Sequence, residues 1–254
     1  MAPVYKRVMV KISGEALAGD GAQNMDPDAV QFIGSQIAAL HKAGVQVAVM
    51  VGGGNIFRGS SSDQWGIDRV DADFIGMLGT AVNAVVLRGT LQRMLDSDRI
   101  PLMVSLDMQD IGEPYIRSKA LARLASYGIL LLACGTGQPY VTTDYPAVQR
   151  ALELDAEALL VAKNGVDGVY TADPRRDPDA VRYDHLSYDD VLKQGLMVMD
   201  QTAFALARDN ALPIHVVSIG ESGALLRAAE GEAIGTTISV DGASRLAGQP
   251  AAGA

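Results

Sequence analysis

The chain has 254 residues, of which 48% are hydrophobic and only 5% aromatic, so one large α/β domain or two closely packed lobes can form around an aliphatic core. Its 30 acidic and 21 basic side chains give a net charge of −9, which argues against a protein that coats nucleic acid or an anionic membrane. The single cysteine excludes an intrachain disulfide, the N-terminus lacks the pattern of a signal peptide, and no apolar run approaches the roughly 20 residues that span a bilayer. We therefore expect a soluble cytoplasmic protein with no nucleic-acid or membrane partner.

The first half of the chain alternates apolar runs with helical periodicity. We expect a strand at 4–12, a flexible loop at 19–24, a helix from Asp26-Pro27 to near Gly44 and a strand at 45–51. A polar loop or short lid at 60–70 should lead into the longest helix, from 71 to about 95. A strand at 100–106, an irregular stretch at 107–115, a helix at 116–127 and a strand at 128–134 should follow. Gly76 and Gly79 would let the longest helix pack closely on another subunit, although an internal core helix fits its pattern as well.

The second half continues the alternation. We expect a helix from Asp144 to near Leu154, a strand at 156–163, a turn-rich stretch at 164–180, helices at 187–195 and 201–210, a strand at 213–219, a short helix at 221–231, a strand at 235–240 and a disordered tail at 241–254. Strands that alternate with helices predict an α/β fold with a mostly parallel sheet, helices on both faces and ligands at the carboxyl ends of the strands. No repeat or linker divides the chain, so residues 1–240 are expected to form a single domain.

Three predicted strand ends carry groups that bind phosphate. They are Lys11-Ile12-Ser13-Gly14, then Gly52-Gly53-Gly54 followed by Arg58, and then Gly135-Thr136-Gly137 followed by Thr142-Thr143. Glycine lacks Cβ, so its backbone can take φ > 0 and its N–H groups can approach a ligand closely. A lone triple glycine also fits a tight turn, but three such features at one sheet edge favour phosphoryl transfer. Neither a Walker A sequence nor GxGxxG occurs, so the common nucleotide folds are not indicated.

Six stretches then resemble, in order and spacing, the bacterial uridylate (UMP) kinases of the amino acid kinase family. They are KISGEAL (11–17), GGGNIFRG (52–59), Asp73 with GMLGT (76–80), GTGQPYVTTD (135–144), KNGVDGVYTADP (163–174) and VMDQTAFALARDNALPI (198–214). The resemblance covers roughly residues 5–239. It implies a three-layer α/β/α sandwich, commonly a homohexamer, that transfers the ATP γ-phosphate to UMP with Mg²⁺ in de novo pyrimidine biosynthesis. The acceptor-binding part would span about 1–155 and the ATP-binding part about 156–240.

Carried onto this sequence, the resemblance implies that Lys11 lies at the transferring phosphoryl group, that Arg58 contacts the phosphates, and that Asp144 orients Lys11 or a magnesium-bound water. The implied ATP site comprises Lys11, Ile12, Ser13, Gly14, Gly54, Arg58, Asn164, Tyr170 and Asp173. The implied UMP site comprises Gly53, Asp73, Thr136, Gly137, Gln138, Pro139, Tyr140, Val141, Thr142 and Thr143. No dedicated protein metal site is expected. The UMP phosphate is largely dianionic at pH 7 and would need no general base.

Two residues of the implied UMP site depart from the family pattern, and the role of one lysine stays open. Gln138 stands where asparagine is usual and Val141 where an aromatic residue is usual, so the uracil pocket is expected to differ in detail. Lys163 can support the phosphates from the ATP-binding part or cap a strand. The resemblance also implies GTP activation and UTP inhibition as candidate regulation, with residues 19–24 in the region linked to GTP.

Two alternative functions remain open from the sequence. A sibling kinase could act on carbamate, acetylglutamate or aspartate, but those acceptors have no ribose for Asp73 to bind. A nucleotide sensor or oxyanion-storage assembly could use the same fold without catalysis, but the retention of Lys11, Arg58 and Asp144 argues against it.

Overall fold

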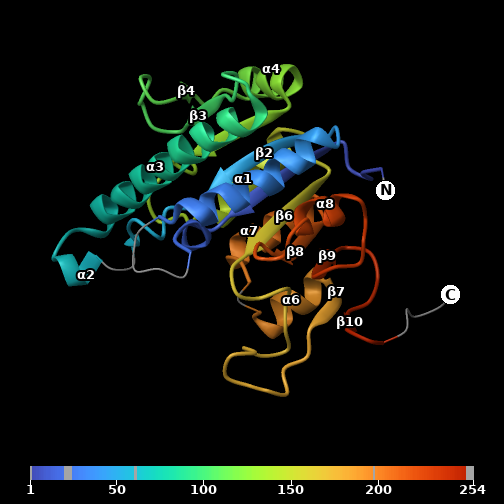
Figure 1. Ribbon diagram of the computed structural model, residues 1–254. Helices are drawn as coiled ribbons and strands as arrows, with labels where there is room; N and C mark the ends of the chain where they lie inside the picture. Colours follow the sequence, from blue (N-terminus) through green and yellow to red (C-terminus); the bar gives the residue numbers. More distant parts are fainter. Residues whose placement is uncertain (1, 20–24, 60–61, 197, 250–254) are drawn as a thin grey trace.

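The computed structural model in Figure 1 describes residues 2–19, 25–59, 62–196 and 198–249. Within these residues one sheet runs through the molecule in the strand order β10-β7-β9-β8-β6-β1-β2-β5-β3-β4. Its strands are β1 (Arg7–Ile12), β2 (Gln46–Val51), β3 (Leu102–Val104), β4 (Glu113–Pro114), β5 (Ile129–Ala133), β6 (Ala158–Lys163), β7 (Tyr183–Ser187), β8 (Ile214–Ser218), β9 (Thr236–Ser239) and β10 (Arg245–Leu246).

Helices cover both faces of this sheet. They are the 3₁₀ turn η1 (Gly14–Leu17) and the α-helices α1 (Pro27–Lys42), α2 (Ser62–Trp65), α3 (Arg69–Leu95), α4 (Arg117–Tyr127), α5 (Asp144–Glu153), α6 (Tyr188–Gln194), α7 (Gln201–Asp209) and α8 (Ala224–Ala229). Helices α1, α3 and α8 share one hydrophobic cluster with one face of the sheet, and α4 to α7 share another with the opposite face. The three-layer α/β/α arrangement is therefore confirmed (Figure 1).

The central strands are apolar because both of their faces are covered. In β1, Val8 and Val10 pack in the cluster under α1 while Met9, between them, packs in the cluster under α5. Strand β1 pairs in parallel with both β2 and β6, so the pattern expected of a buried parallel strand is confirmed. This pairing brings the carboxyl ends of β1, β2, β5 and β6 to one edge of the sheet.

Two helix starts follow the capping chemistry of the sequence. The side chain of Asp26 accepts hydrogen bonds from the N–H groups of Asp28 and Ala29, with Pro27 in the first turn. Ser187 caps α6 in the same way by accepting from the Asp190 N–H. Both helices therefore start where the sequence predicts.

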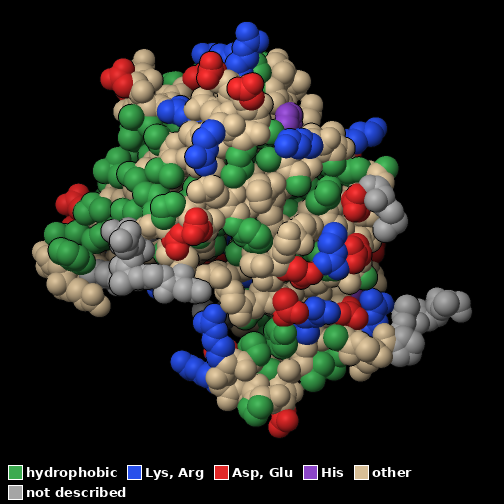
Figure 2. Space-filling model, viewed as in Figure 1, with side chains coloured by type: hydrophobic (Ala, Val, Ile, Leu, Met, Phe, Trp, Pro, Cys, Tyr) green, Lys and Arg blue, Asp and Glu red, His purple; other side chains and the backbone are tan. Residues whose placement is uncertain are grey.

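Helix α3 is the longest and carries an exposed apolar stripe. The stripe consists of Ile75, Leu78, Val82 and Val86, which are 37–46% exposed. Figure 2 shows hydrophobic side chains gathered on this side of the molecule. By length and composition alone, α3 is the one helix of the described residues that could cross a membrane, which differs from our expectation for the sequence. Core helices pass the same test, and α3 packs on α1 and β5.

Five features differ from the expected elements. Strand β7 is absent from our prediction because Asp184 and His185 interrupt its apolar character, and β9 runs antiparallel to β8. Part of the tail predicted to be disordered forms β10, because its backbone pairs with β7 through Arg245 and Leu246. The predicted polar loop at 60–70 contains α2, and the irregular stretch at 107–115 contains β4. Positions 20–24 of the predicted flexible loop, 60–61 of the polar loop and 250–254 of the tail lie outside the described residues.

Candidate active site

A cleft of about 370 Å³ opens at the carboxyl ends of β1, β2 and β5. All three phosphate-binding features of the sequence contribute to its walls. Of the predicted site residues, the cleft is lined by Lys11, Ser13, Gly14, Gly53, Gly54, Arg58, Asp73, Thr136, Gln138, Val141, Thr142 and Thr143. The convergence expected from the order of strands and glycines is therefore present.

The glycine loop, which we define as residues 52–54, lies directly against the loop after β1. The Gly52 N–H donates to the Ile12 carbonyl at 2.8 Å, and a Cβ on Gly14 would come within 2.8 Å of the Gly54 nitrogen. A Cβ on Gly53 would lie 2.4 Å from the Gly76 carbonyl of α3. No residue of the loop has a positive φ angle, so the conformational freedom of glycine is not what this loop uses. Glycine is required because three backbone segments meet at close range, leaving no room for a side chain.

Lys11 and Asp144 form an ion pair beside the cleft. The ammonium of Lys11, from the end of β1, lies 2.7 Å from Oδ1 of Asp144, the first residue of α5. The side chains are only 10% and 13% exposed, so water screens the pair weakly. The second carboxylate oxygen of Asp144 accepts from the Asp200 N–H at 3.3 Å. Asp144 therefore fixes the direction of the Lys11 side chain. The lysine charge faces the phosphate loops, by which we mean residues 11–14 and the glycine loop.

Arg58 stands at the rim of the cleft. Its guanidinium forms an ion pair with Glu15 and also donates to the Gly54 carbonyl at 3.4 Å. Both charged side chains are more than half exposed, so the pair contributes little to stability. Arg58 can therefore exchange its partner for a phosphate group at little cost.

Asp73 lines the cleft from the first half of α3. Its carboxylate accepts from Arg69, one turn earlier in α3, at 2.9 Å and from the Tyr140 N–H at 2.8 Å. The second contact ties α3 to the segment that we name the acceptor loop, residues 135–143. Farther along this loop, the Thr142 hydroxyl donates to Asp200 at 2.5 Å. The second half of the acceptor loop is thus held by two carboxylates that lie far away in the sequence.

The remaining predicted acceptor residues differ in placement. Tyr140 is 68% exposed with a φ of 64°, and its side chain, like that of Pro139, does not line the cleft. Gly137 has a φ of 76°, and a Cβ there would lie 2.5 Å from the Ser105 carbonyl, so the turn itself requires glycine. The Ile12 side chain is fully buried in the core and could contact a ligand only through its backbone.

A second cavity of about 380 Å³ lies beyond β6, in the predicted ATP-binding part. Tyr170, Asp173 and Lys163 line it, whereas the exposed Asn164 does not. The Lys163 ammonium donates to the Val198 carbonyl at 2.5 Å. Burial, and then repulsion from Lys11, hold the pKa of Lys163 below its usual value. The two lysines are therefore close enough to influence each other across the end of β6.

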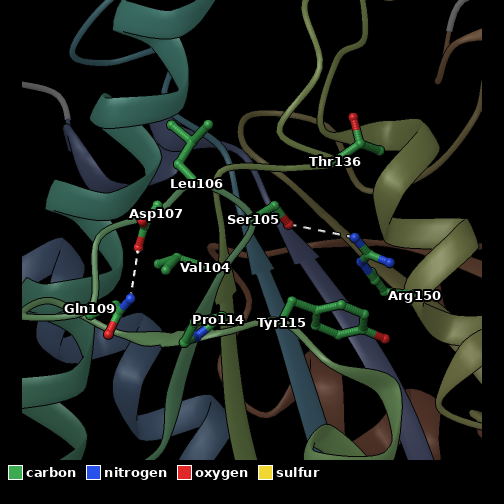
Figure 3. Close-up of a pocket in the computed structure, with 9 residues that line it drawn as sticks. All are labelled: Val104, Ser105, Leu106, Asp107, Gln109, Pro114, Tyr115, Thr136 and Arg150. Atoms are coloured by element: carbon green, nitrogen blue, oxygen red, sulfur yellow. Dashed lines mark hydrogen bonds between the residues drawn. The ribbon is translucent and has the colours of Figure 1, made fainter.

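A third cavity, of about 460 Å³, lies behind the acceptor loop (Figure 3). Thr136 lines both this cavity and the cleft. Arg150 lies 3.7 Å from the centroid of the Tyr115 ring and within 2.6 Å of Glu153. Burial and the hydrogen bond to Glu153 raise the pKa of Tyr115, so its hydroxyl stays protonated. These contacts brace the back of the acceptor loop, because Ser105 in the same cavity donates to the Gly135 carbonyl at 2.8 Å.

Several residues of the site were missed from the sequence. Among the partners, only Arg69 had a local signal, its i,i+4 spacing to Asp73 on a predicted helix. Glu15 lines the cleft and Asp200 bonds to Thr142 of the acceptor loop, both through tertiary packing that no local pattern encodes. Thr80 and Asn83 are buried residues of α3 that bond to the backbone beside the cleft, but in the sequence they resemble ordinary polar positions of a helix.

Comparisons with known proteins show the family to which the chain belongs. The model of the amino acid kinase family matches residues 6–218. A uridylate kinase of Frankia alni is 51% identical over 94% of this chain and 93% of its own length, and one of Pediococcus pentosaceus is 46% identical over 92% and 96%. The crystal structure of a UMP kinase from Bacillus anthracis aligns with a TM-score of 0.92 at 45% identity, covering 95% of this chain and 98% of that one. A UMP kinase structure from Ureaplasma parvum aligns with a TM-score of 0.85 at 31% identity, covering 92% and 98%.

Proposed function

The chain belongs to the amino acid kinase family, and we propose that it is a UMP kinase. It would transfer the γ-phosphate of ATP reversibly to UMP, giving UDP and ADP, as a cytoplasmic step of de novo pyrimidine nucleotide biosynthesis leading to CTP. The observation that carries this proposal is the cleft itself. Lys11, Arg58 and the close-packed glycines line it together with Asp73 and the acceptor loop. That combination of groups suits a substrate that carries a phosphate, a ribose and a base.

The acceptor would lie along α3. The Asp73 carboxylate suits ribose hydroxyls, because a carboxylate accepts hydrogen bonds from hydroxyl donors. Thr136, Gln138, Val141 and their neighbours in the acceptor loop would enclose the uracil and the UMP phosphate. Carbamate or an amino acid would leave Asp73 and the acceptor loop without a partner. A nucleotide is therefore favoured over the acceptors of the sibling kinases.

Transfer would depend on bringing two polyanions together. Lys11 would stabilise the charge that develops on the transferring group, with Arg58 and the N–H groups of the glycine loop on the neighbouring oxygens. Asp144, at 2.7 Å from Lys11, would hold the ammonium in that direction. The acceptor phosphate is already deprotonated at neutral pH, so no general base is needed.

The residues present fit a magnesium ion that arrives with ATP. Asp144 supplies one carboxylate beside the phosphate loops, and kinases commonly hold Mg²⁺ through one or two carboxylates together with substrate phosphates. The ion would supply further neutralisation of the phosphate charge when bound. Asp144 would then both orient Lys11 and lie next to the ion.

ATP would occupy the second cavity, with its phosphates directed toward Lys11. Tyr170 and Asp173 are the candidates for adenine and ribose contact. Lys163, at the carboxyl end of β6, lines the second cavity and is our candidate for a phosphate contact from the ATP-binding part. Residues 1–155 would thus bind the acceptor and residues 156–240 the donor within one domain.

Self-assembly is the second part of the proposal. The apolar stripe of α3 gives a second copy of this chain a continuous surface to cover, and a homohexamer is the assembly implied by the family resemblance. GTP and UTP are proposed as effectors on the same resemblance. Their action is tested by adding each nucleotide to the assay described below.

A coupled ADP-release assay with Mg-ATP tests the function directly. The acceptors would be UMP, CMP, dUMP, carbamate, aspartate and acetylglutamate. We expect turnover confined largely to UMP. Activity on an amino acid or carbamate would discard the acceptor-site assignment, and nucleotide binding without turnover of any acceptor would favour a sensor or storage role.

A further inference from the structure

One turn of α3 contacts both loops that enclose the cleft. Thr80 and Asn83 are three residues apart, so they lie on the same face of the helix. Their exposed fractions are 3% and 0%. Buried polar side chains are costly unless their hydrogen bonds are satisfied. Here the partners include the backbone of the glycine loop and of the residue just before the acceptor loop.

Asn83 holds the glycine loop. Its amide nitrogen donates to the Gly52 carbonyl at 2.7 Å and to the Asn55 side chain at 2.7 Å. Its amide oxygen accepts from the Asn55 nitrogen at 3.1 Å. The amide therefore spans both ends of the turn that contains the glycine loop, and all three of its hydrogen-bonding groups are used.

Thr80 holds the start of the acceptor loop. Its hydroxyl donates to the Met77 carbonyl at 2.7 Å and accepts from the Cys134 N–H at 2.7 Å. Cys134 has a φ of 65°, a left-handed conformation that a non-glycine residue keeps only when its surroundings enforce it. The hydroxyl is one such constraint, placed immediately before Gly135.

We propose that Thr80 and Asn83 are positioning residues that set the separation between the glycine loop and the acceptor loop. The inference rests on the proposed function, because that separation matters for catalysis only if phosphoryl groups meet between the loops. Misplacement of reacting groups by about 1 Å can cost on the order of 100-fold in rate. Both side chains act through the backbone that they hold. Thr80 also forms part of the cleft wall, with its hydroxyl bonded to Met77 and Cys134, whereas Asn83 does not line the cleft.

Kinetics of matched variants test the proposal. Thr80→Val keeps the shape and removes the hydroxyl, Thr80→Ser restores the hydroxyl, and Asn83→Leu removes the amide. Thr90→Val makes the same chemical change on α3 where the helix faces Gly34 of α1, away from both loops. We expect Thr80→Val to raise the KM for UMP about tenfold with little change in the KM for ATP, and Asn83→Leu to lower kcat about tenfold. Thr80→Ser and Thr90→Val should behave like the wild type.

Hydrogen exchange of the same proteins gives a readout that does not depend on activity. Thr80→Val should speed amide exchange in peptides covering 134–143 but not 46–58, and Asn83→Leu should do the reverse. Exchange that is unchanged, or raised equally in both segments, would overturn the proposal. So would local exchange changes with unaltered kinetics, or losses of activity that merely follow the loss of folded protein. If the wild type does not phosphorylate UMP, the proposed function fails and the exchange pattern still decides whether this turn holds the loops.

Discussion

The ammonium of Lys11 and the carboxylate of Asp144 lie 2.7 Å apart, although 133 positions separate them in the sequence. Lys11 is the last residue but one of the first strand, and Asp144 begins the helix that follows the acceptor loop. This contact joins the phosphate loops to the acceptor loop, so changes at either residue should have effects on both stability and turnover.

Lys11→Met should abolish measurable turnover while ATP binding remains. Loss of the lysine removes the cation at the transfer point and leaves Asp144 nearly buried without its partner, at a cost of about 3 kcal/mol in unfolding free energy. Adding Asp144→Asn should recover much of the stability but none of the activity. Turnover by the coupled assay and chemical denaturation test both parts, and a Lys11→Met variant that still turns over would remove this lysine from the mechanism.

Gly53→Ala should impair the enzyme at both substrates. The added Cβ would meet the Gly76 carbonyl at 2.4 Å, so the glycine loop must move away from α3. We expect a loss of kcat/KM of about 100-fold for the acceptor. Gly89→Ala is the matched control, because a Cβ there meets nothing within 4 Å and alanine should stabilise the helix by about 0.5–1 kcal/mol. Similar kinetics for the two variants would contradict the close-packing argument.

Asp73→Asn should weaken acceptor binding selectively. The amide keeps the shape of the carboxylate but loses the charge that holds Arg69 and part of its capacity to accept hydrogen bonds. The KM for UMP should rise about tenfold or more while the KM for ATP changes little. A rise confined to the KM for ATP would show that this part of the cleft binds the donor instead.

Stability should fall as the pH drops below about 6.5, in part because of His215. Burial lowers the pKa of this residue to about 4 in the folded protein, while its hydrogen bonds to Tyr5 and Thr237 persist with a neutral ring. The unfolded chain therefore binds the proton first, and stability present above pH 6.5 is lost progressively as the pH falls toward 4, by about 3 kcal/mol in all. Denaturant unfolding of the wild type and His215→Gln across this range tests the effect, since the variant should lose correspondingly less. Parallel pH profiles would exclude His215 as the source.

Val82→Glu should disrupt self-assembly without unfolding the protein. A charge in the middle of the apolar stripe would have to be desolvated if a second copy covers it. Light scattering should then report a smaller particle than the wild type. Val240→Glu is the matched control, because Val240 is exposed to the same extent, 46%, on a different part of the surface. An unchanged mass for Val82→Glu would exclude the stripe as the contact.

Local pattern was sufficient for the elements that are buried on both faces or capped by their own side chains. Strand β2 and the Asp26 cap of α1 are examples, because burial and capping leave direct marks on the residue types. The strand β7 carries polar residues at a partly covered position, and β10 depends on backbone pairing rather than side chains. Neither leaves such a mark, so both were missed, as was the antiparallel direction of β9.

In the candidate site, too, some residues could be predicted from local sequence pattern and others could not. The glycines and Lys11 could be placed at one sheet edge because parallel strands carry their carboxyl ends to the same side. Asp200 could not be assigned to the acceptor loop, since its contact with Thr142 depends on how α7 packs against α5. Thr80 was likewise hidden, because a buried threonine on a helix has the same local sequence whether it braces a loop or only its own helix.

The turn of α3 behind the cleft also constrains how the specificity of such a protein can diverge. Thr80 and Asn83 each hold backbone beside the cleft that every substrate must meet, so a substitution at either position is expected to cost activity with all acceptors. Residues 138–141, by contrast, extend beyond the braced start of the acceptor loop and can vary individually. New acceptor preferences are therefore expected to arise by exchange of loop residues on an unchanged helix, and a library randomised at Gln138 and Val141 should yield them more often than one randomised at Thr80 and Asn83.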